Sequence, residues 1–341
     1  MLSNQTIIYN LEMKTYQQLW QSLTPLYDAG EAQAIVRTVL DVKYGMTLTD
    51  IIGGKVNEIS ADEERKLEEI IIRLQKGEPV QYVLGEADFA GRPFHVEPGV
   101  LIPRPETAEL CQWIEKDMIE KSIVSSGDSS EDSSGNSPQA TDDARRILDI
   151  CTGSGCIAIT LGLNIPNSEV TGWDISEDAL RIAQGNVEMM KAGNVRIEHQ
   201  DALALPKVAE TDNEKMKGND DKEVVKPKGE AKTPSTQKWD LIVSNPPYIC
   251  EKEKADMEKN VLEHEPSIAL FVPDENPLKF YRAIAEYASS ALKPGGALYF
   301  EINPIYEKET REMLLKLDFK DIETKEDAFG KKRMMRAKST K

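Results

Sequence analysis

A short apolar strand that two prolines bring to an end constrains the fold of this chain more than any other feature. Residues 240–244 contain the consecutive apolar run Leu-Ile-Val, which is typical of a buried strand. Asn245, Pro246, Pro247 and Tyr248 follow directly. Because proline lacks an N–H and has a fixed φ, the strand must end there in a stiff, extended turn. Ligands bind at the carboxyl ends of strands in open α/β sheets, so the sequence predicts a ligand site at this turn.

The groups in this turn suit a planar amide or amino nitrogen as the reacting atom. Such a nitrogen is a poor nucleophile because its lone pair is delocalised. The Asn245 side-chain oxygen and the Pro246 carbonyl can each accept one of its N–H groups, and the Tyr248 ring can stack on the planar group. An electrophile in line with the lone pair would then complete a displacement by positioning more than by acid–base chemistry. The alternative interpretation is a tight turn without function, because Asn-Pro pairs are common in turns.

Predicted strands and helices alternate around this turn. We expect five strands, at 147–150, 170–175, 195–199, 240–244 and 297–302, and then two terminal strands at 321–325 and 333–338. Helices are expected at 156–163, 177–190, 277–292 and 308–317, and Pro294-Gly295-Gly296 should cap the third of them. This alternation predicts a mostly parallel, doubly wound α/β sheet.

The turn after residues 147–150 is a second candidate site. It consists of the small residues Cys151, Thr152, Gly153, Ser154 and Gly155, and it opens a helix. Backbone without bulky side chains can approach a ligand closely at a helix N-terminus. The sequence therefore predicts cofactor binding here.

Acidic residues near this turn narrow the choice of cofactor. Asp174 ends the next predicted strand and is placed to accept hydrogen bonds from ribose hydroxyls, while Asp201 and Ala202 follow the third strand, where adenine would lie. The same features describe NAD binding, but the turn lacks the Gly-x-Gly-x-x-Gly spacing and has no phosphate-binding lysine. An uncharged turn beside Asp149 favours S-adenosylmethionine, whose sulfonium methyl is the electrophile that Asn245 would need.

The segments before the sheet predict a small helical domain and a linker. Apolar residues recur at helical spacing through residues 1–85, and Trp20, Leu23 and Leu26 indicate an early helix. Residues 86–105 predict a β-hairpin linker split at Pro98-Gly99, followed by a helix from Glu106. Two polar segments, 121–143 and 207–237, contain too few apolar residues to fold alone and are interpreted as disordered insertions.

Composition excludes several classes of protein. The formal net charge of −17 argues against broad binding to a phosphate backbone, which needs clustered Lys and Arg. No window approaches the roughly 18 apolar residues of a transmembrane helix, and no signal peptide is visible. The four cysteines and three histidines show no metal-ligand spacing, so we expect a reduced, cytoplasmic protein without a structural metal.

Taken together, these residues resemble the class I methyltransferases, and within them the PrmC/HemK family, the protein-(glutamine-N5) methyltransferases of peptide chain release factors. The resemblance covers nearly the whole chain. Its motifs are Gly77-Glu78-Pro79, Ile102 to Thr107, Asp149 to Gly155, Ser244 to Ile249, Glu265-Pro266 with Ala269-Leu270, and Gly330 to Arg333. It implies a Rossmann-like, seven-stranded class I methyltransferase domain at 106–341, preceded by an all-α N-terminal domain at 1–85 and the β-hairpin linker at 86–105.

The resemblance also implies the reaction and the residues that carry it. The methyl group of S-adenosylmethionine would pass to the amide nitrogen of the glutamine in the Gly-Gly-Gln loop of release factors. Asn245, Pro246 and Tyr248 would be catalytic, and together with Pro247 they would bind the substrate. Cofactor binding would involve Cys151, Thr152, Gly153, Ser154, Gly155, Asp174, Asp201, Ala202 and Asn245.

The chain departs from the family at two places. The family usually has Gly at the position of Cys151, so we expect a backbone there that does not require glycine, with a small packed side chain instead of a reactive thiol. Glu301-Ile302-Asn303 differs from another common family variant and receives no role.

The partners follow from the same resemblance. We expect release factors as protein substrates, with the N-terminal domain helping to bind them. We expect no direct nucleic acid partner, no membrane partner and a monomer.

Two other functions remain open from the sequence. An N(6)-adenine or other exocyclic-amine nucleic acid methyltransferase would also use Asn-Pro-Pro-Tyr, but such enzymes usually carry a basic face, which is not visible here. A non-enzymatic S-adenosylmethionine-binding adaptor would predict a damaged motif, whereas residues 245–248 are intact.

Overall fold

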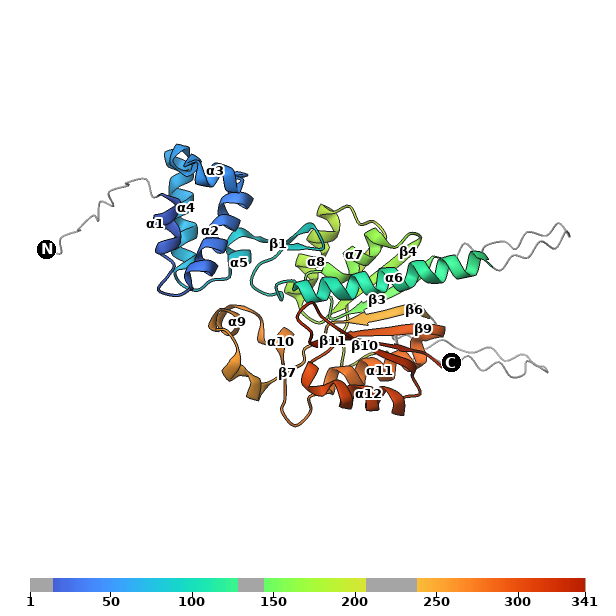
Figure 1. The fold of residues 1–341 in the computed structure, drawn as a ribbon. Coiled ribbons are helices and arrows are strands. Elements are labelled where there is room, and N and C mark those ends of the chain that lie inside the picture. The colour runs from blue at the N-terminus through green and yellow to red at the C-terminus, as the bar shows by residue number, and fades with distance from the viewer. Residues whose placement is uncertain (1–14, 128–143, 207–237, 341) are drawn as a thin grey trace, which may run out of the picture. The chain divides into compact units, whose positions relative to one another are not determined.

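The computed structural model describes residues 15–127, 144–206 and 238–340, the stretch 120–127 by its backbone alone. Contacts divide the chain into two units (Figure 1). The helical unit comprises residues 1–86, 96–98 and 257–265, and the sheet unit comprises 87–95, 99–256 and 266–341, each within its described part. The predicted insertion 207–237 and residues 128–143 of the other insertion lie outside the described residues.

The helical unit consists of helices of 4 to 16 residues, and the first four α-helices begin at residues whose side chains cap them. They are α1 (Tyr16–Gln21), α2 (Ala29–Tyr44), α3 (Leu48–Ile52), η1 (Lys55–Glu58), α4 (Ala61–Leu74) and α5 (Val80–Leu84). Thr15, Thr47 and Ser60 each form a capping box, which satisfies backbone N–H groups at the start of a helix. Because Pro25 disfavours helical backbone in the residue before it, α1 ends earlier than predicted, although Leu23 is buried. The predicted helical character of this region is confirmed.

The helical unit also contains a segment from far along the chain. Residues 257–265, with α9 (Lys259–His264), belong to it. Burial raises the pKa of Glu31, and the like charge of Glu258 raises that pKa further, so the two side chains lie near each other. No sequence pattern indicated this association.

A seven-stranded sheet organises the sheet unit, as predicted (Figure 1). Its order is β10-β11-β9-β6-β3-β4-β5. The parallel strands are β3 (Arg145–Ile150), β4 (Ser168–Asp174), β5 (Val195–His199), β6 (Trp239–Ser244) and β9 (Leu292–Glu301). The antiparallel strands β11 (Lys332–Lys338) and β10 (Lys320–Glu326) complete one edge. The Rossmann-like class I fold with a preceding helical region and a β-hairpin is therefore confirmed.

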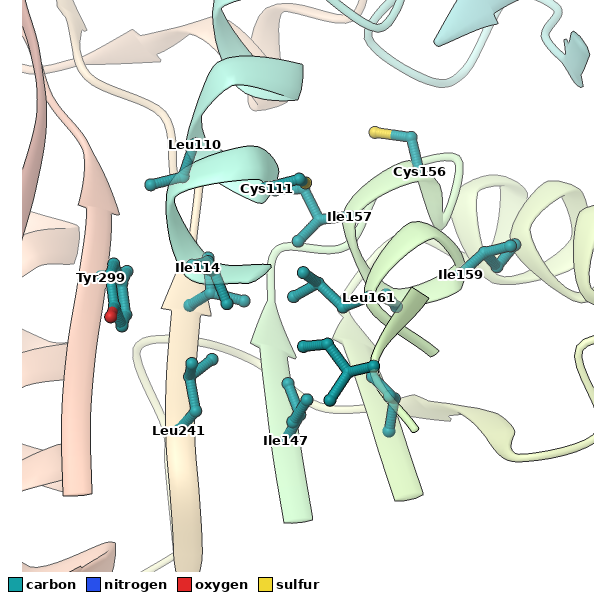
Figure 2. Packing of buried hydrophobic residues seen from close by; sticks show 14 of the residues in the cluster. Leu110, Cys111, Ile114, Ile147, Cys156, Ile157, Ile159, Leu161, Leu241 and Tyr299 are labelled. Atoms are coloured by element: carbon teal, nitrogen blue, oxygen red, sulfur yellow. The ribbon is translucent and has the colours of Figure 1, made fainter. Parts of the chain in front are cut away.

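Helices cover both faces of this sheet because successive strand residues point to opposite sides. Leu241 and Val243 of β6 pack in one core cluster with α6 (Pro105–Gly127) and α7 (Cys156–Asn164), to which α8 (Glu177–Met189) adds Val187. Figure 2 shows Ile147 and Leu241 on their strands, facing side chains of α6 and α7. Ile242 packs on the other face with α11 (Lys279–Ala291) and α12 (Glu307–Lys316). Each fully buried aliphatic side chain of this kind contributes about 1.5–3 kcal/mol to folding.

Several local predictions were wrong. The hairpin consists of β1 (Glu86–Phe89) and β2 (Arg92–His95), so its turn lies at Ala90-Gly91, where both residues have positive φ, and not at Pro98-Gly99. Pro294-Gly295-Gly296 does not cap α11, because β9 begins at Leu292 and bulges through these residues.

Other elements differ in extent or were missed. Helix α6 continues to Gly127, into the segment predicted as an insertion from residue 121. Between β6 and α11 the chain forms η2 (Glu251–Asp256), α10 (Ser267–Leu270) and a two-stranded sheet of β7 (Ile249–Cys250) and β8 (Phe271–Val272). A 3-10 helix, η3 (Pro304–Tyr306), precedes α12.

Candidate active site

A cavity of about 350 Å³ lies at the carboxyl ends of the parallel strands. The segments that follow β3, β4, β5 and β6 all contribute to its wall. Nine of the predicted functional residues line it, namely Cys151, Thr152, Gly153, Ser154, Asp174, Asp201, Ala202, Asn245 and Pro247. Gly155, Pro246 and Tyr248 are not part of the lining.

The turn after β3 is held against Asp174 by backbone hydrogen bonds. The Gly153 N–H donates to Asp174 Oδ2 at 2.9 Å, and the Ser176 N–H donates to Oδ1 at 3.0 Å. Each carboxylate oxygen keeps a further lone pair that can accept a hydroxyl hydrogen. Burial raises the pKa of Asp174, and these backbone hydrogen bonds partly oppose that effect. Asp174 is therefore both a support for the turn and an acceptor at the cavity wall.

Cys151 adopts a left-handed backbone conformation, with φ of +64°. The expectation that this position does not need a backbone suited to glycine was therefore wrong. An L-residue pays about 1–2 kcal/mol for this conformation. Burial raises the pKa of the Cys151 thiol well above its usual value, with further contributions from Asp174 and Asp149, so the sulfur stays protonated and unreactive.

Gly155 serves the packing of helices behind the turn. It has φ of +80° and caps the N-terminus of α7. A Cβ at this position would lie 3.1 Å from Ile159 Cδ1 and 3.3 Å from Ala183 Cβ, closer than most side chains approach. The positive φ and these close helix contacts together favour glycine at this position.

Asp149 lies at 0% exposure beneath the turn. The Thr152 hydroxyl donates to its Oδ2 at 2.6 Å, and the Ala158 N–H donates to the same oxygen at 3.2 Å. Among the described residues, Asp149 Oδ1 has no hydrogen-bond partner. Burial raises the pKa of Asp149 to about 7, although both hydrogen bonds lower it.

The residues after β5 close another part of the cavity. Asp201 Oδ1 accepts the N–H of Leu203 at 2.8 Å, which fixes the turn. Ala202 is buried and lines the cavity beside it. This acid and this small apolar side chain together suit a planar ring that carries an amino group.

The Asn-Pro-Pro-Tyr turn connects to residues that the sequence left without a role. Asn245 is half-buried, and its Nδ2 donates to Thr107 Oγ1 at 3.1 Å. The Tyr248 hydroxyl donates to Glu301 Oε1 at 3.0 Å. Burial raises the pKa of Tyr248 well above its usual value, and Glu301 adds to the effect, so the phenol remains protonated. Pro246, which follows Asn245 in the sequence, is buried.

Three residues were missed as parts of this neighbourhood, namely Thr107, Glu301 and Asn303. Asn303 Nδ2 donates to the Tyr248 carbonyl at 3.2 Å and so holds the turn from behind. The available signal for Glu301 was a carboxylate at the end of the apolar strand β9, where a buried charge needs a specific partner. Thr107 belongs to the Ile-Pro-Arg-Pro-Glu-Thr motif, but spacing alone did not place it beside Asn245.

Comparison with known proteins decides the family. The family model described as the PrmC N-terminal domain matches residues 25–85, and the one described as a methyltransferase domain matches residues 141–303. A release factor glutamine methyltransferase of Bacteroides thetaiotaomicron is 43% identical over 93% of this chain and 96% of its own length. The chain belongs to the release factor glutamine methyltransferase family.

A second relative agrees with this membership. A release factor glutamine methyltransferase of Flavobacterium psychrophilum is 35% identical over 95% of this chain and 98% of its own length. The family assignment does not rest on solved structures, among which the hMettl16 catalytic domain in complex with MAT2A 3'UTR hairpin 6 is 13% identical, with a TM-score of 0.47 and coverage of 83% of each chain.

S-adenosylmethionine is the cofactor of this methyltransferase family, and the residues at the cavity fit it. The small side chains of the turn 151–154 leave room for a ligand close to the backbone, and Asp174 and Asp201 supply carboxylate acceptors on the same cavity wall. None of the described helices is long and apolar enough to cross a membrane. Within the described ranges, no group of three or more His, Cys, Asp and Glu side chains is placed to hold a metal ion.

Proposed function

We propose that this methyltransferase modifies the side-chain amide nitrogen of the glutamine in the Gly-Gly-Gln loop of peptide chain release factors. The main support is the 43% identity between this chain and a release factor glutamine methyltransferase, over nearly the full length of both proteins. The half-buried Asn245 on the cavity wall supports the proposal, because its amide suits a planar amide substrate. The reaction would place the protein in translation termination as a protein-methylating enzyme.

The residues after β6 would bind and orient the substrate amide. Asn245 Oδ1 and the Pro246 carbonyl would each accept one N–H of the glutamine, and Tyr248 and Pro247 would pack against its plane. S-adenosylmethionine supplies the electrophilic methyl group. The lone pair of the oriented nitrogen would then face away from its two acceptors, and orientation would contribute more than proton transfer.

Cofactor binding would fall to the wall of the cavity. The backbone of Cys151, Thr152, Gly153 and Ser154 would contact the amino-acid portion, and Gly155 would hold the helix behind them. Asp174 would accept from the ribose hydroxyls, and Asp201 with Ala202 would contact the adenine. Asn245 would contact both cofactor and substrate because it lies on the same wall.

We further propose the domain roles and the setting of the enzyme. Residues 1–85 would help to bind the release factor, and 86–105 would act as a linker. Residues 106–341 would form the catalytic domain, apart from 257–265, which belong to the helical unit. Its insertions would be 207–237 and, after α6 ends at Gly127, 128–143. A glutamine alone offers too little surface for specificity, so a second binding surface is needed. The enzyme would be a cytoplasmic monomer that binds neither nucleic acid nor a membrane directly.

Transfer of labelled methyl from S-adenosylmethionine tests the substrate. Purified release factor, its loop Gln→Ala variant and DNA are offered in parallel. Label should appear on the release factor and disappear with the loop glutamine. Label on DNA alone would establish the exocyclic-amine alternative and overturn the proposal.

A further inference from the structure

Four side chains of the sheet unit form one line of hydrogen bonds, which begins at the cavity wall with Asn245 and Thr107. Asn245 Nδ2 donates to Thr107 Oγ1 at 3.1 Å, and Thr107 Oγ1 lies 2.6 Å from Glu301 Oε2. The other oxygen of Glu301 accepts from the Tyr248 hydroxyl at 3.0 Å. Thr107 and Glu301 are buried, at 2% exposure each, so water does not substitute for these contacts.

The number of hydrogens on these side chains determines which group donates and which accepts in each of the three hydrogen bonds. A hydroxyl has one hydrogen to donate. If Glu301 is ionised it can only accept, and the single Thr107 hydrogen must point to it. Thr107 Oγ1 can then only accept from Asn245, so the amide must turn its NH₂ toward Thr107. With the Asn245 amide flipped, two oxygens would face each other without a hydrogen between them.

Three neighbouring groups stabilise the charged form of the Glu301 carboxylate. Burial raises the pKa of Glu301, while hydrogen bonds from Thr107 and Tyr248 and the positive charge of Arg333 lower it. Arg333 is itself paired with Asp327, with 3.3 Å between Nε and Oδ2. The nearby charge of Glu106 acts in the opposite direction to Arg333.

We propose that Glu301 and Thr107 are positioning residues, which together fix the Asn245 amide so that its oxygen is presented to the substrate nitrogen. Among the described residues, none donates a hydrogen bond to Asn245 Oδ1, so this oxygen is available as an acceptor. Glu301 holds the Tyr248 hydroxyl at the same time. One buried carboxylate thus orients both side chains that flank the two prolines.

This inference rests on the proposed function, because it assigns residues to the same substrate amide. Neither residue needs to touch the substrate. We call the hydrogen-bonded series Asn245–Thr107–Glu301–Tyr248 the relay. It orients the Asn245 oxygen before substrate binds, which lowers the entropic cost of ordering that side chain during the reaction.

Matched variants of Thr107 test the relay. Thr107→Val keeps the shape and removes the hydroxyl, whereas Thr107→Ser keeps the hydroxyl. With saturating S-adenosylmethionine and release factor, Thr107→Val should slow single-turnover methyl transfer by roughly tenfold or more. It should leave cofactor affinity and thermal unfolding near wild type, and Thr107→Ser should restore most of the rate. Wild-type rates in Thr107→Val, or equal losses in both variants, would overturn the relay.

Glu301→Gln provides a second test, because the two hydroxyls face two different carboxylate oxygens and Gln replaces one of these oxygens with an NH₂ that can only donate. The rate loss of the double variant with Thr107→Val should be smaller than the product of the two single losses, since both act through one line. Fully multiplicative losses would mean two independent structural effects and would overturn the proposal.

A readout without substrate separates this inference from the proposed function. In protein labelled with ¹⁵N-asparagine, the side-chain NH₂ signal of Asn245, assigned by its loss in Asn245→Ala, should show a hydrogen-bonded proton with slow exchange. Thr107→Val should abolish this protection and Thr107→Ser should keep it. Wild-type protein that fails to label release factor but shows this pattern would overturn the proposed function alone, and an unchanged signal in Thr107→Val would overturn the relay.

Discussion

In the proposed mechanism, Asn245 on the cavity wall accepts a hydrogen bond from the substrate amide. Replacing Asn245 with Ala would remove this acceptor but leave the turn 151–155 unchanged. We expect Asn245→Ala to lower the methyl-transfer rate roughly a hundredfold or more, with affinity for S-adenosylmethionine largely spared. Single-turnover kinetics and calorimetric cofactor titration measure the two quantities. Turnover at the wild-type rate would contradict the assigned role.

Cys151 stores backbone strain that a glycine would release. Cys151→Gly and Cys151→Ala both lose the sulfur contacts, but only Ala keeps a side chain at φ of +64°. We therefore expect the Gly variant to be more stable than the Ala variant by about 1 kcal/mol in the free energy of unfolding.

Cys156 offers a matched control for this comparison. It is buried at the start of α7, where the backbone is helical. There the order should reverse, with Ala more stable than Gly by about 1 kcal/mol. The same order at both positions would show that strain at Cys151 does not contribute.

The raised pKa of Asp149 predicts a pH-dependent stability. Its carboxyl binds a proton more tightly in the folded protein, so its contribution is complete below the unfolded pKa and is lost as the pH rises through about 7. The free energy of unfolding of wild type, relative to Asp149→Asn, should fall by about 2–3 kcal/mol between about pH 5 and about pH 7. Denaturant unfolding of both proteins without cofactor measures this difference, and parallel pH curves would contradict it.

At the level of helices and strands, Asn186 of α8 connects the hairpin to the turn 151–155 by hydrogen bonds. Its Oδ1 accepts the His95 N–H at 2.8 Å, and its Nδ2 donates to the carbonyls of His95 and Ser154 at 3.0 Å and 2.9 Å. Asn186→Ala removes these three hydrogen bonds, so we expect the free energy of unfolding to fall by about 2–4 kcal/mol and hydrogen exchange in β2 to become faster.

Asn194→Ala is the control for this prediction. Asn194 Nδ2 also donates to two carbonyls, of Gly162 and Ser168, and within the described ranges it donates no hydrogen bond to the hairpin. The control should lose stability without faster exchange in β2. Equal exchange rates in β2 of both variants would contradict a role of Asn186 in holding the hairpin.

Strands of the sheet were predictable from their apolar residues, which are consecutive in β6 and alternate with polar residues in β5. Residues 195–199 and 240–244 match the observed strands almost to the residue. Pro294-Gly295-Gly296 misled the prediction because the same residues that end helices also form bulges, and only pairing with β6 distinguishes the two.

Within the site, local motifs were predictable and long-range contacts were not. Cys151 to Ser154, Asp174 and Asn245 each follow a strand, so their common edge follows from the topology. Thr107 and Glu301 are 194 residues apart and meet only through packing, which no spacing rule encodes. The left-handed backbone at Cys151 is likewise a property of the folded turn.

At the scale of the whole molecule, we expect the order of α9 to depend on the N-terminal helices. Its residues share a unit with the N-terminal helices, and Val261 and Leu262 are half-buried. Removing residues 1–85 should therefore speed hydrogen exchange in 257–265 strongly while β3 and β6 remain protected. Mass spectrometry of the exchanging protein measures both regions, and protection of 257–265 in the shortened chain would contradict the assignment.

The membership of residues 257–265 in the helical unit has a consequence for synthesis on the ribosome. The first 86 residues leave the exit tunnel early, yet the last piece of their unit emerges only after most of the sheet has been translated. The helical unit therefore lacks residues 257–265 during most of translation, and it can complete its folding only late in synthesis. A gene fusion that transplanted only the first 86 codons would carry this unit without its closing segment.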